Sequence, residues 1–144
     1  MRISRMFAAI AALGLLTASV AMGADAKKIS QEGSVKGDSG ASAQLILLKS
    51  GGALKSVKNV KFKDLRTSCD TGTARITLKL SGAAKTDENG NFKRTYKDGK
   101  TKIKLEGKVK PDGSRVHGSI KGSTIRTAGI GRCDVPSLEF TTKR

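Results

Sequence analysis

The chain has 144 residues and a formal net charge of +16, from 28 Lys and Arg against 12 Asp and Glu. A chain this basic attracts polyanions. It has no Trp, one Tyr and four Phe, so it lacks the aromatic surface on which single-stranded nucleic acids and sugar rings usually stack. Two Cys and one His are too few for a four-ligand zinc site, and we expect no metal and no cofactor.

Residues 1–23 have the pattern of an export signal peptide. Arg2 and Arg5 precede an uncharged apolar run over residues 6–22, which matches the n-region and h-region of such a peptide. Small residues follow with the spacing of a cleavage site. The apolar run is short for a membrane span, which needs about 20 residues. We therefore predict a secreted or periplasmic protein of the cell envelope that is not transmembrane after cleavage.

Residues 24–41 read ADAKKISQEGSVKGDSGA, a polar stretch with Gly and Ser and without a period. This composition is typical of a flexible leader. The remaining residues, 42–144, are enough for a single β domain with a modest core. The apolar run AQLILLK at 43–49 has the length of a buried strand and is ended by two glycines.

Further along the chain, apolar and polar residues alternate, which is the period of a strand with one dry face and one wet face. The alternating segments are 60–63, 74–80, 102–109, 115–121 and 138–140. Asn89-Gly90, Asp98-Gly99 and Pro111-Asp112-Gly113 supply turns between strands. The pattern predicts an all-β fold, either an antiparallel β-sandwich or a closed β-barrel of about seven to eight short strands.

Cys69 and Cys133 are the only cysteines, and both lie in the part of the chain that we expect to be exported. Oxidising conditions there favour a disulfide bond between them. Closing a loop of this length should stabilise the fold by about 4 kcal/mol. We therefore predict one disulfide and no free thiol.

The segments VKNVKFKDLRTSC at 57–69, IKLEGKVKPDGSRVHGSIKG at 103–122 and CDVPSLEFTTKR at 133–144 resemble a family of small secreted bacterial β-domains with two cysteines and no assigned activity. The resemblance covers residues 55–144. It implies a β-sandwich-like fold with a bridge from Cys69 to Cys133 and transfers no site residues. Members of that family often carry Trp, which this chain lacks.

A hairpin over residues 97–122 carries the densest positive charge. Its outward positions, together with the turn, hold a candidate polyanion-binding set: Lys102, Lys104, Lys108, Lys110, Arg115 and Lys121. Lys61, Lys63, Arg75 and Lys79 extend this set if their strands join the same sheet. One interpretation is a solvated face that keeps the sheet soluble and blocks edge pairing; the other is adhesion to a polyanion through many weak, salt-screened contacts.

Two other groups of residues have some features of a site. Residues 87–98 place oxygen-bearing side chains at calcium-loop positions, but Phe92 stands where that loop needs Gly, so a hairpin turn explains the segment better. His117 falls at an outward strand position without a nucleophile-elbow motif. We expect a surface histidine and no catalytic residues, and a hydrolase is the least favoured class.

The sequence thus predicts an exported, non-catalytic β-domain that binds anionic envelope or surface polymers, or lipid headgroups, through a basic sheet face. Nucleic acid is a less favoured partner because export removes the chain from the cytoplasm. The alternative is a protein-binding module or an inhibitor of a secreted enzyme, which would use loops at residues 50–56, 83–91 and 123–136 gathered at one end of the domain.

Overall fold

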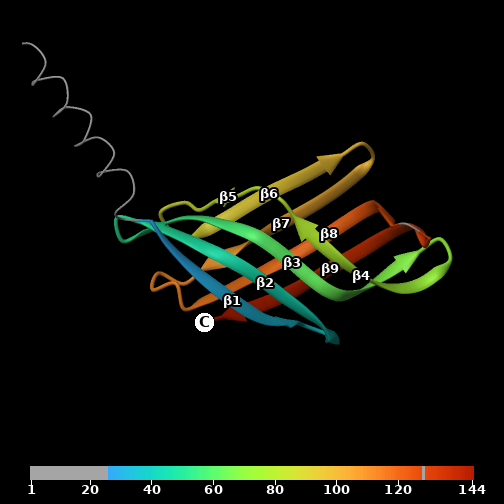
Figure 1. The fold of residues 1–144 in the computed structure, drawn as a ribbon, viewed down its shortest axis with the longest axis horizontal. Coiled ribbons are helices and arrows are strands. Elements are labelled where there is room, and N and C mark those ends of the chain that lie inside the picture. Colours follow the sequence, from blue (N-terminus) through green and yellow to red (C-terminus); the bar gives the residue numbers. More distant parts are fainter. Residues whose placement is uncertain (1–25, 128) are drawn as a thin grey trace, which may run out of the picture.

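The computed structural model describes residues 26–127 and 129–144, which form an all-β fold without helices (Figure 1). The predicted signal peptide lies outside the described residues. The strands are β1 (Lys27–Val35), β2 (Asp38–Ser50), β3 (Ala53–Cys69), β4 (Gly72–Leu80), β5 (Ala84–Lys85), β6 (Asn91–Asp98), β7 (Thr101–Val109), β8 (Arg115–Thr127) and β9 (Gly131–Lys143). The all-β prediction is confirmed.

All strands belong to one antiparallel sheet in the order β4-β3-β2-β1-β9-β8-β7-β6. The hairpin of β1 and β2 lies between β3 and β9 over part of their length. Beyond the tip of this hairpin, β3 pairs directly with β9 through Ser68 with Asp134 and Cys69 with Cys133. The fold is therefore a closed antiparallel barrel with extra strands, which decides between the two predicted architectures.

A second, shorter closure joins β3 to β6. The two-residue strand β5 pairs with β3, through Ser56 with Lys85 and Val57 with Ala84. The next residue, Thr86, forms an isolated antiparallel bridge with Phe92 of β6. Only this one bridge connects the β3 side of the barrel to β6 among the described residues, so the seam there is weakly closed.

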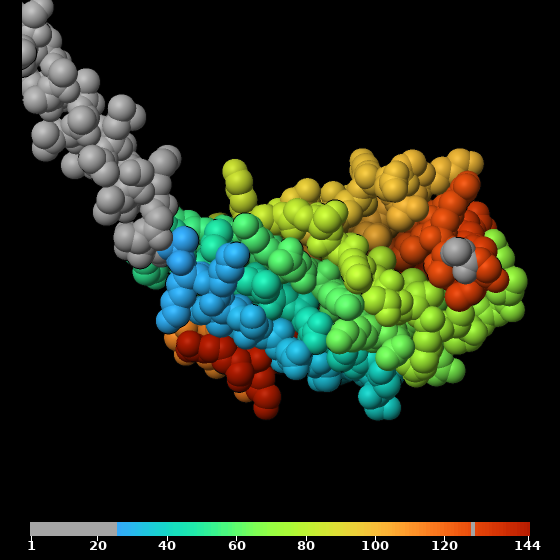
Figure 2. Space-filling view, in the orientation of Figure 1, coloured from blue at the N-terminus to red at the C-terminus, as the bar shows by residue number. Residues whose placement is uncertain are grey.

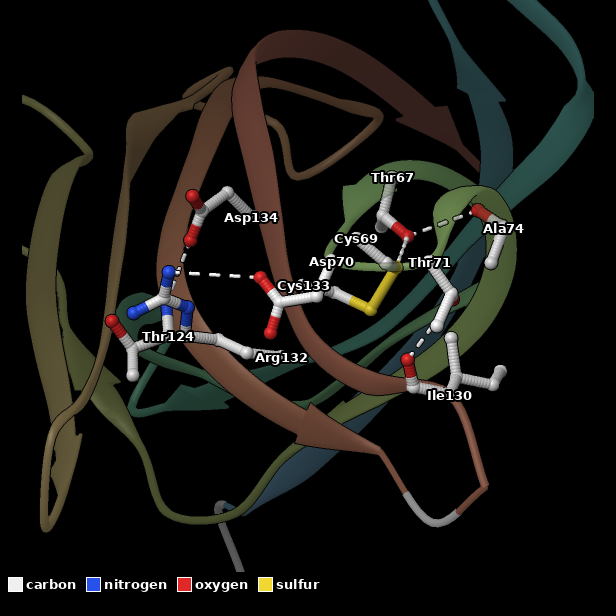
Figure 3. The surroundings of a disulfide bond; sticks show 10 residues. All are labelled: Thr67, Cys69, Asp70, Thr71, Ala74, Thr124, Ile130, Arg132, Cys133 and Asp134. Carbon is white, nitrogen blue, oxygen red and sulfur yellow. Dashed lines mark hydrogen bonds and ion pairs between the residues drawn. A yellow bond between two sulfur atoms is a disulfide. The ribbon is translucent and has the colours of Figure 1, made fainter.

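The disulfide between Cys69 and Cys133 lies at the direct contact of β3 with β9 (Figure 3). This confirms the predicted pairing, and no free cysteine occurs in the described chain. Polar contacts surround it: Thr71 donates a hydrogen bond to the carbonyl of Ile130 at 3.2 Å, and Arg132 pairs with Asp70 at 3.6 Å. The bridge and these contacts tie the β3–β4 turn to the start of β9.

Aromatic rings fill the barrel where two inward positions are glycine. Phe62 and Phe140 meet edge to face, with ring centroids 5.1 Å apart. A Cβ on Gly118 would lie 2.5 Å from the Phe140 ring, and one on Gly107 would lie 2.7 Å from the Phe92 ring. These glycines are therefore needed because the rings, and at Gly107 also the backbone carbonyl of His117, occupy the space that a side chain would take.

The prediction of a flexible leader over residues 24–41 was wrong for the residues that the structure describes. Residues 27–35 form β1 and residues 38–41 begin β2. The inward positions of β1 are Ile29, Gln31, Gly33 and Val35, so the alternation is interrupted by a polar residue and a glycine. Gln31 is nevertheless only 1% exposed, because its side chain is satisfied by hydrogen bonds.

The tip of the β1–β2 hairpin is anchored by a buried carboxylate. Asp38 is 7% exposed. It accepts a hydrogen bond from the backbone amide of Arg66 at 2.9 Å and one from Arg75 Nη1 at 3.1 Å. The hydrogen bond from the Arg66 amide is the main cause of the lowered pKa of Asp38. The hydrogen bond and the charge of Arg75 lower this pKa further, whereas burial raises it.

We expect Asp38→Asn to reduce the acid sensitivity of the fold. The pKa of Asp38 is lowered on folding, so the ionised carboxylate adds to the free energy of unfolding. This stabilisation is complete above the unfolded-state pKa, ~3.9, and is lost as pH falls through the folded-state pKa. The variant should lose about 1–3 kcal/mol of unfolding free energy at pH 7 and less at pH 3. Urea unfolding at the two pH values measures this difference; an equal loss at both would contradict it.

Candidate anion-binding face

The outward side chains of β6, β7 and β8 form a continuous positive surface, which we call the basic face. Phe92, Leu105 and Ile120 mark the buried, inward side of these strands. The residues between them point to solvent, and the charged ones at these outward positions are exposed. The cations of the basic face, taken from β6, β7 and residues 115–121 of β8, which precede the bulge of that strand, are Lys93, Lys97, Lys102, Lys104, Lys108, Arg115 and Lys121. Glu106 is the one carboxylate at an outward position of these three strands.

The register of the strands brings like charges together. Lys97 is opposite Lys102 across β6 and β7, and Lys104 is opposite Lys121 across β7 and β8. Like charges directly opposite one another destabilise a sheet. The row through Glu106 is different, because Lys93 is its neighbour on β6. The basic face therefore has two repulsive rows and one compensated row.

The cations of the basic face take part in none of the ion pairs found in residues 26–127 and 129–144. Those pairs are Lys36 with Glu139, Arg75 with Asp38, and Arg132 with Asp70. Each of them lies on other strands or in turns. The charges of the basic face are thus left to solvent or to an external anion.

The structure places five of the six predicted cations on the basic face; Lys110 is exposed in the turn that follows β7. Of the predicted extension, Lys79 on β4 lines a groove together with Lys97 of the basic face, whereas β3 is separated from β8 by β2, β1 and β9 in the sheet order. Lys61 and Lys63 are half-buried, and Arg75 is held by Asp38 and by the carbonyl of Asp64.

Lys93 and Lys97 also belong to the basic face, although neither was among the predicted cations. Both lie on β6, in the segment FKRTYK between two turns. The buried Phe92 sets the parity of this strand, so Lys93, Thr95 and Lys97 share one side. Alternation counted from Phe92 would have identified both lysines. In Figure 2 the strands β6 and β7 form the yellow and orange margin of the molecule, away from the blue of β1.

His117 lies beside the basic face in a shallow hollow of about 590 Å³ that Glu106, Ser119 and Glu139 also line. Its side chain is exposed, as expected. His117 Nδ1 lies 3.0 Å from Thr141 Oγ1 on the neighbouring strand. The geometry is that of a hydrogen-bonded cross-strand pair.

The segment with calcium-loop spacing is a hairpin turn followed by a strand. The Asp87 carboxylate accepts hydrogen bonds from the backbone amides of Asn89 and Asn91 at 2.9 and 2.8 Å, and the amide of Asn91 is the main cause that lowers its pKa. The strand β6 then separates Asp87 from Asp98. Within the described residues, no group of three or more His, Cys, Asp or Glu is arranged to hold a metal ion.

The loops considered for protein binding do not gather at one end of the barrel. Of those segments, residues 53–56, 84–85, 123–127 and 131–136 belong to strands. The turn at Gly51 and Gly52 precedes β3, whereas Ile130, between β8 and β9, contacts Thr71 beyond the other end of β3. A single loop cluster is therefore absent from the described part of the chain.

The described residues contain no helix that could span a membrane. Comparison of the chain with protein-family models, curated proteins and solved structures found no match. The resemblance of residues 55–144 to small secreted β-domains therefore stays a prediction.

Proposed function

We propose that this protein is an exported, non-catalytic β-domain whose basic face binds anionic polymers of the cell envelope or cell surface. The observation that carries the proposal is the pair of repulsive rows, Lys97 with Lys102 and Lys104 with Lys121, without compensating ion pairs in the described residues. An arrangement that costs stability is explained if an external anion neutralises it. The disulfide agrees with an oxidising compartment.

The basic face suits an extended polymer better than a ligand that stacks on a ring. The only tyrosine, Tyr96, has the inward parity of β6 and is half-buried, so the basic face offers no aromatic platform. What it offers is spaced ammonium and guanidinium groups on an exposed sheet. Such groups bind phosphates or carboxylates through many weak contacts that salt screens.

We expect the basic-face variant, with Gln at Lys102, Lys104, Lys108 and Lys121, to keep its fold and lose polyanion affinity. Each change is exposed and should alter the unfolding free energy by ~0.5 kcal/mol or less. Relief of the Lys104–Lys121 repulsion favours a slightly higher stability. Binding is measured by co-sedimentation with phosphatidylglycerol vesicles and by titration with an acidic polysaccharide such as alginate.

The matched control replaces four exposed lysines outside the basic face with Gln: Lys27, Lys28, Lys55 and Lys85. It removes the same charge from other parts of the barrel. The proposal predicts a larger loss of affinity in the basic-face variant than in the control. An equal loss would attribute binding to the net charge alone and would contradict a local site.

A further inference from the structure

The sheet has an unpaired seam between β4 and β6. Within the described chain, β4 pairs with β3 and β6 pairs with β7, and Thr86 with Phe92 is the only β-bridge between the two sides. Beyond that bridge the facing edges of β4 and β6 have no backbone partner strand in this part of the chain. Exposed edges of this kind are the surfaces to which extended peptides add as a further strand.

A groove of about 930 Å³ follows this seam. Leu78, Ile103 and Ile125 reach it from the core and are 6–7% exposed, unlike fully buried core residues such as Leu105. The groove therefore has an apolar floor that continues the barrel interior.

Arg94 spans part of the seam with its side chain. Its guanidinium donates a hydrogen bond to the carbonyl of Ala83 and lies 4.8 Å from the centre of the Tyr96 ring. A side chain of β6 is thus held against the segment that joins β4 to β5. The Tyr96 hydroxyl is buried without a hydrogen-bond partner in the described structure, so a donor or acceptor that enters the groove would satisfy it.

The rim of the groove is positive. Lys79, Lys97, Lys100 and Arg126 line it together with Arg94, against the single carboxylate of Asp98. None of them belongs to the ion pairs of the described residues. An acidic occupant is therefore favoured over a neutral or basic one.

We propose that the groove takes up an extended peptide of alternating acidic and apolar residues, which pairs as an added strand between β4 and β6. The alternation follows from parity. On β4, Lys79 points outward and Leu78 inward; on β6, Lys97 points outward and Tyr96 inward. Side chains of an inserted strand alternate in the same way, so acidic residues meet the lysines and apolar residues meet the floor. This site is distinct from the proposed polymer site, although Lys97 borders both.

The test uses a fluorescently labelled, end-blocked peptide of alternating Glu and Val with eight residues, the length of β6. The same peptide with N-methyl groups on two central residues keeps its charge but loses backbone donors, and we expect it to bind about tenfold more weakly. A seam variant, Lys79→Gln with Arg126→Gln, should weaken peptide binding several-fold and leave vesicle binding unchanged. The basic-face variant should do the reverse.

Equal affinity for the plain and the N-methylated peptide would show binding by charge alone and would overturn the added strand, as would an unchanged affinity in the seam variant. If laurate bound and the peptide did not, the groove would be a site for anionic amphiphiles and the proposal would be wrong. Loss of vesicle binding in the basic-face variant with intact peptide binding separates the two sites. Circular dichroism of each variant checks that the fold is kept.

Discussion

Replacing Cys69 and Cys133 with alanine should lower the free energy of unfolding by about 4 kcal/mol, because the bridge closes a loop with a sequence separation of 64 and so constrains the unfolded chain. For a domain of this size the melting temperature should fall by on the order of 15 °C. The effect is large because β3 and β9 share only two residue pairs at this closure. Thermal unfolding followed by circular dichroism measures it.

The unmodified protein in reducing agent is the control for the cysteine substitution, since it loses the bond but keeps the side chains. We expect it to melt close to the double variant. Cys133 is 1% exposed. If the double variant were much less stable than the reduced parent, the difference would show that alanine packs less well than cysteine at this buried position. A double variant as stable as the oxidised parent would contradict the role given to the bridge.

Gly33→Ala should destabilise the barrel by at least ~3 kcal/mol, because the added methyl group has no space to occupy. Gly33 lies on β1 opposite Thr142 of β9. A Cβ at this position would overlap the backbone carbonyl of Thr141 and lie 2.6 Å from the Cα of Thr142. Backbone atoms in a paired strand cannot move aside without breaking the pairing of β1 with β9. Urea unfolding gives the energy, and amide exchange should show early opening of β1.

Gly122→Ala is the matched control for Gly33. Gly122 is also a strand glycine, but the nearest contact of an added Cβ would be the terminal methyl of Ile125 at 2.8 Å. That side chain is able to change rotamer, so we expect a cost of about 1 kcal/mol. If Gly33→Ala and Gly122→Ala lowered the free energy of unfolding equally, this would contradict the close approach of β1 to β9 at Gly33.

The sequence predicts strands well where one face is uniformly apolar. In β7, Ile103, Leu105 and Val109 are inward and buried, so alternation alone gives both the strand and its exposed lysines. In β1 the inward Gln31 hides the same alternation. Its amide donates to the carbonyl of Gly113 at 2.7 Å, and it accepts from Thr142 Oγ1 at 2.7 Å. These partners are 82 and 111 residues away, so no local pattern reports that Gln31 is buried.

The choice between sandwich and barrel was also beyond the sequence pattern. Closure depends on two short contacts, Cys69 with Cys133 and Thr86 with Phe92, and neither changes the alternation of the strands that carry it. β5 has only two residues, too few to show a period. The groove at the seam follows from the same non-local geometry, because the residues of its floor come from three different strands.

The salt dependence of polyanion binding tests the basic face most directly, with duplex DNA as a probe of known charge spacing. The slope of log affinity against log salt should become shallower by about 0.9 for each phosphate that the protein no longer neutralises. We predict a clearly shallower slope for the basic-face variant and a slope close to that of the parent for the control at Lys27, Lys28, Lys55 and Lys85. An unchanged slope in the basic-face variant, or an equal change in both, would contradict a binding site on β6, β7 and β8.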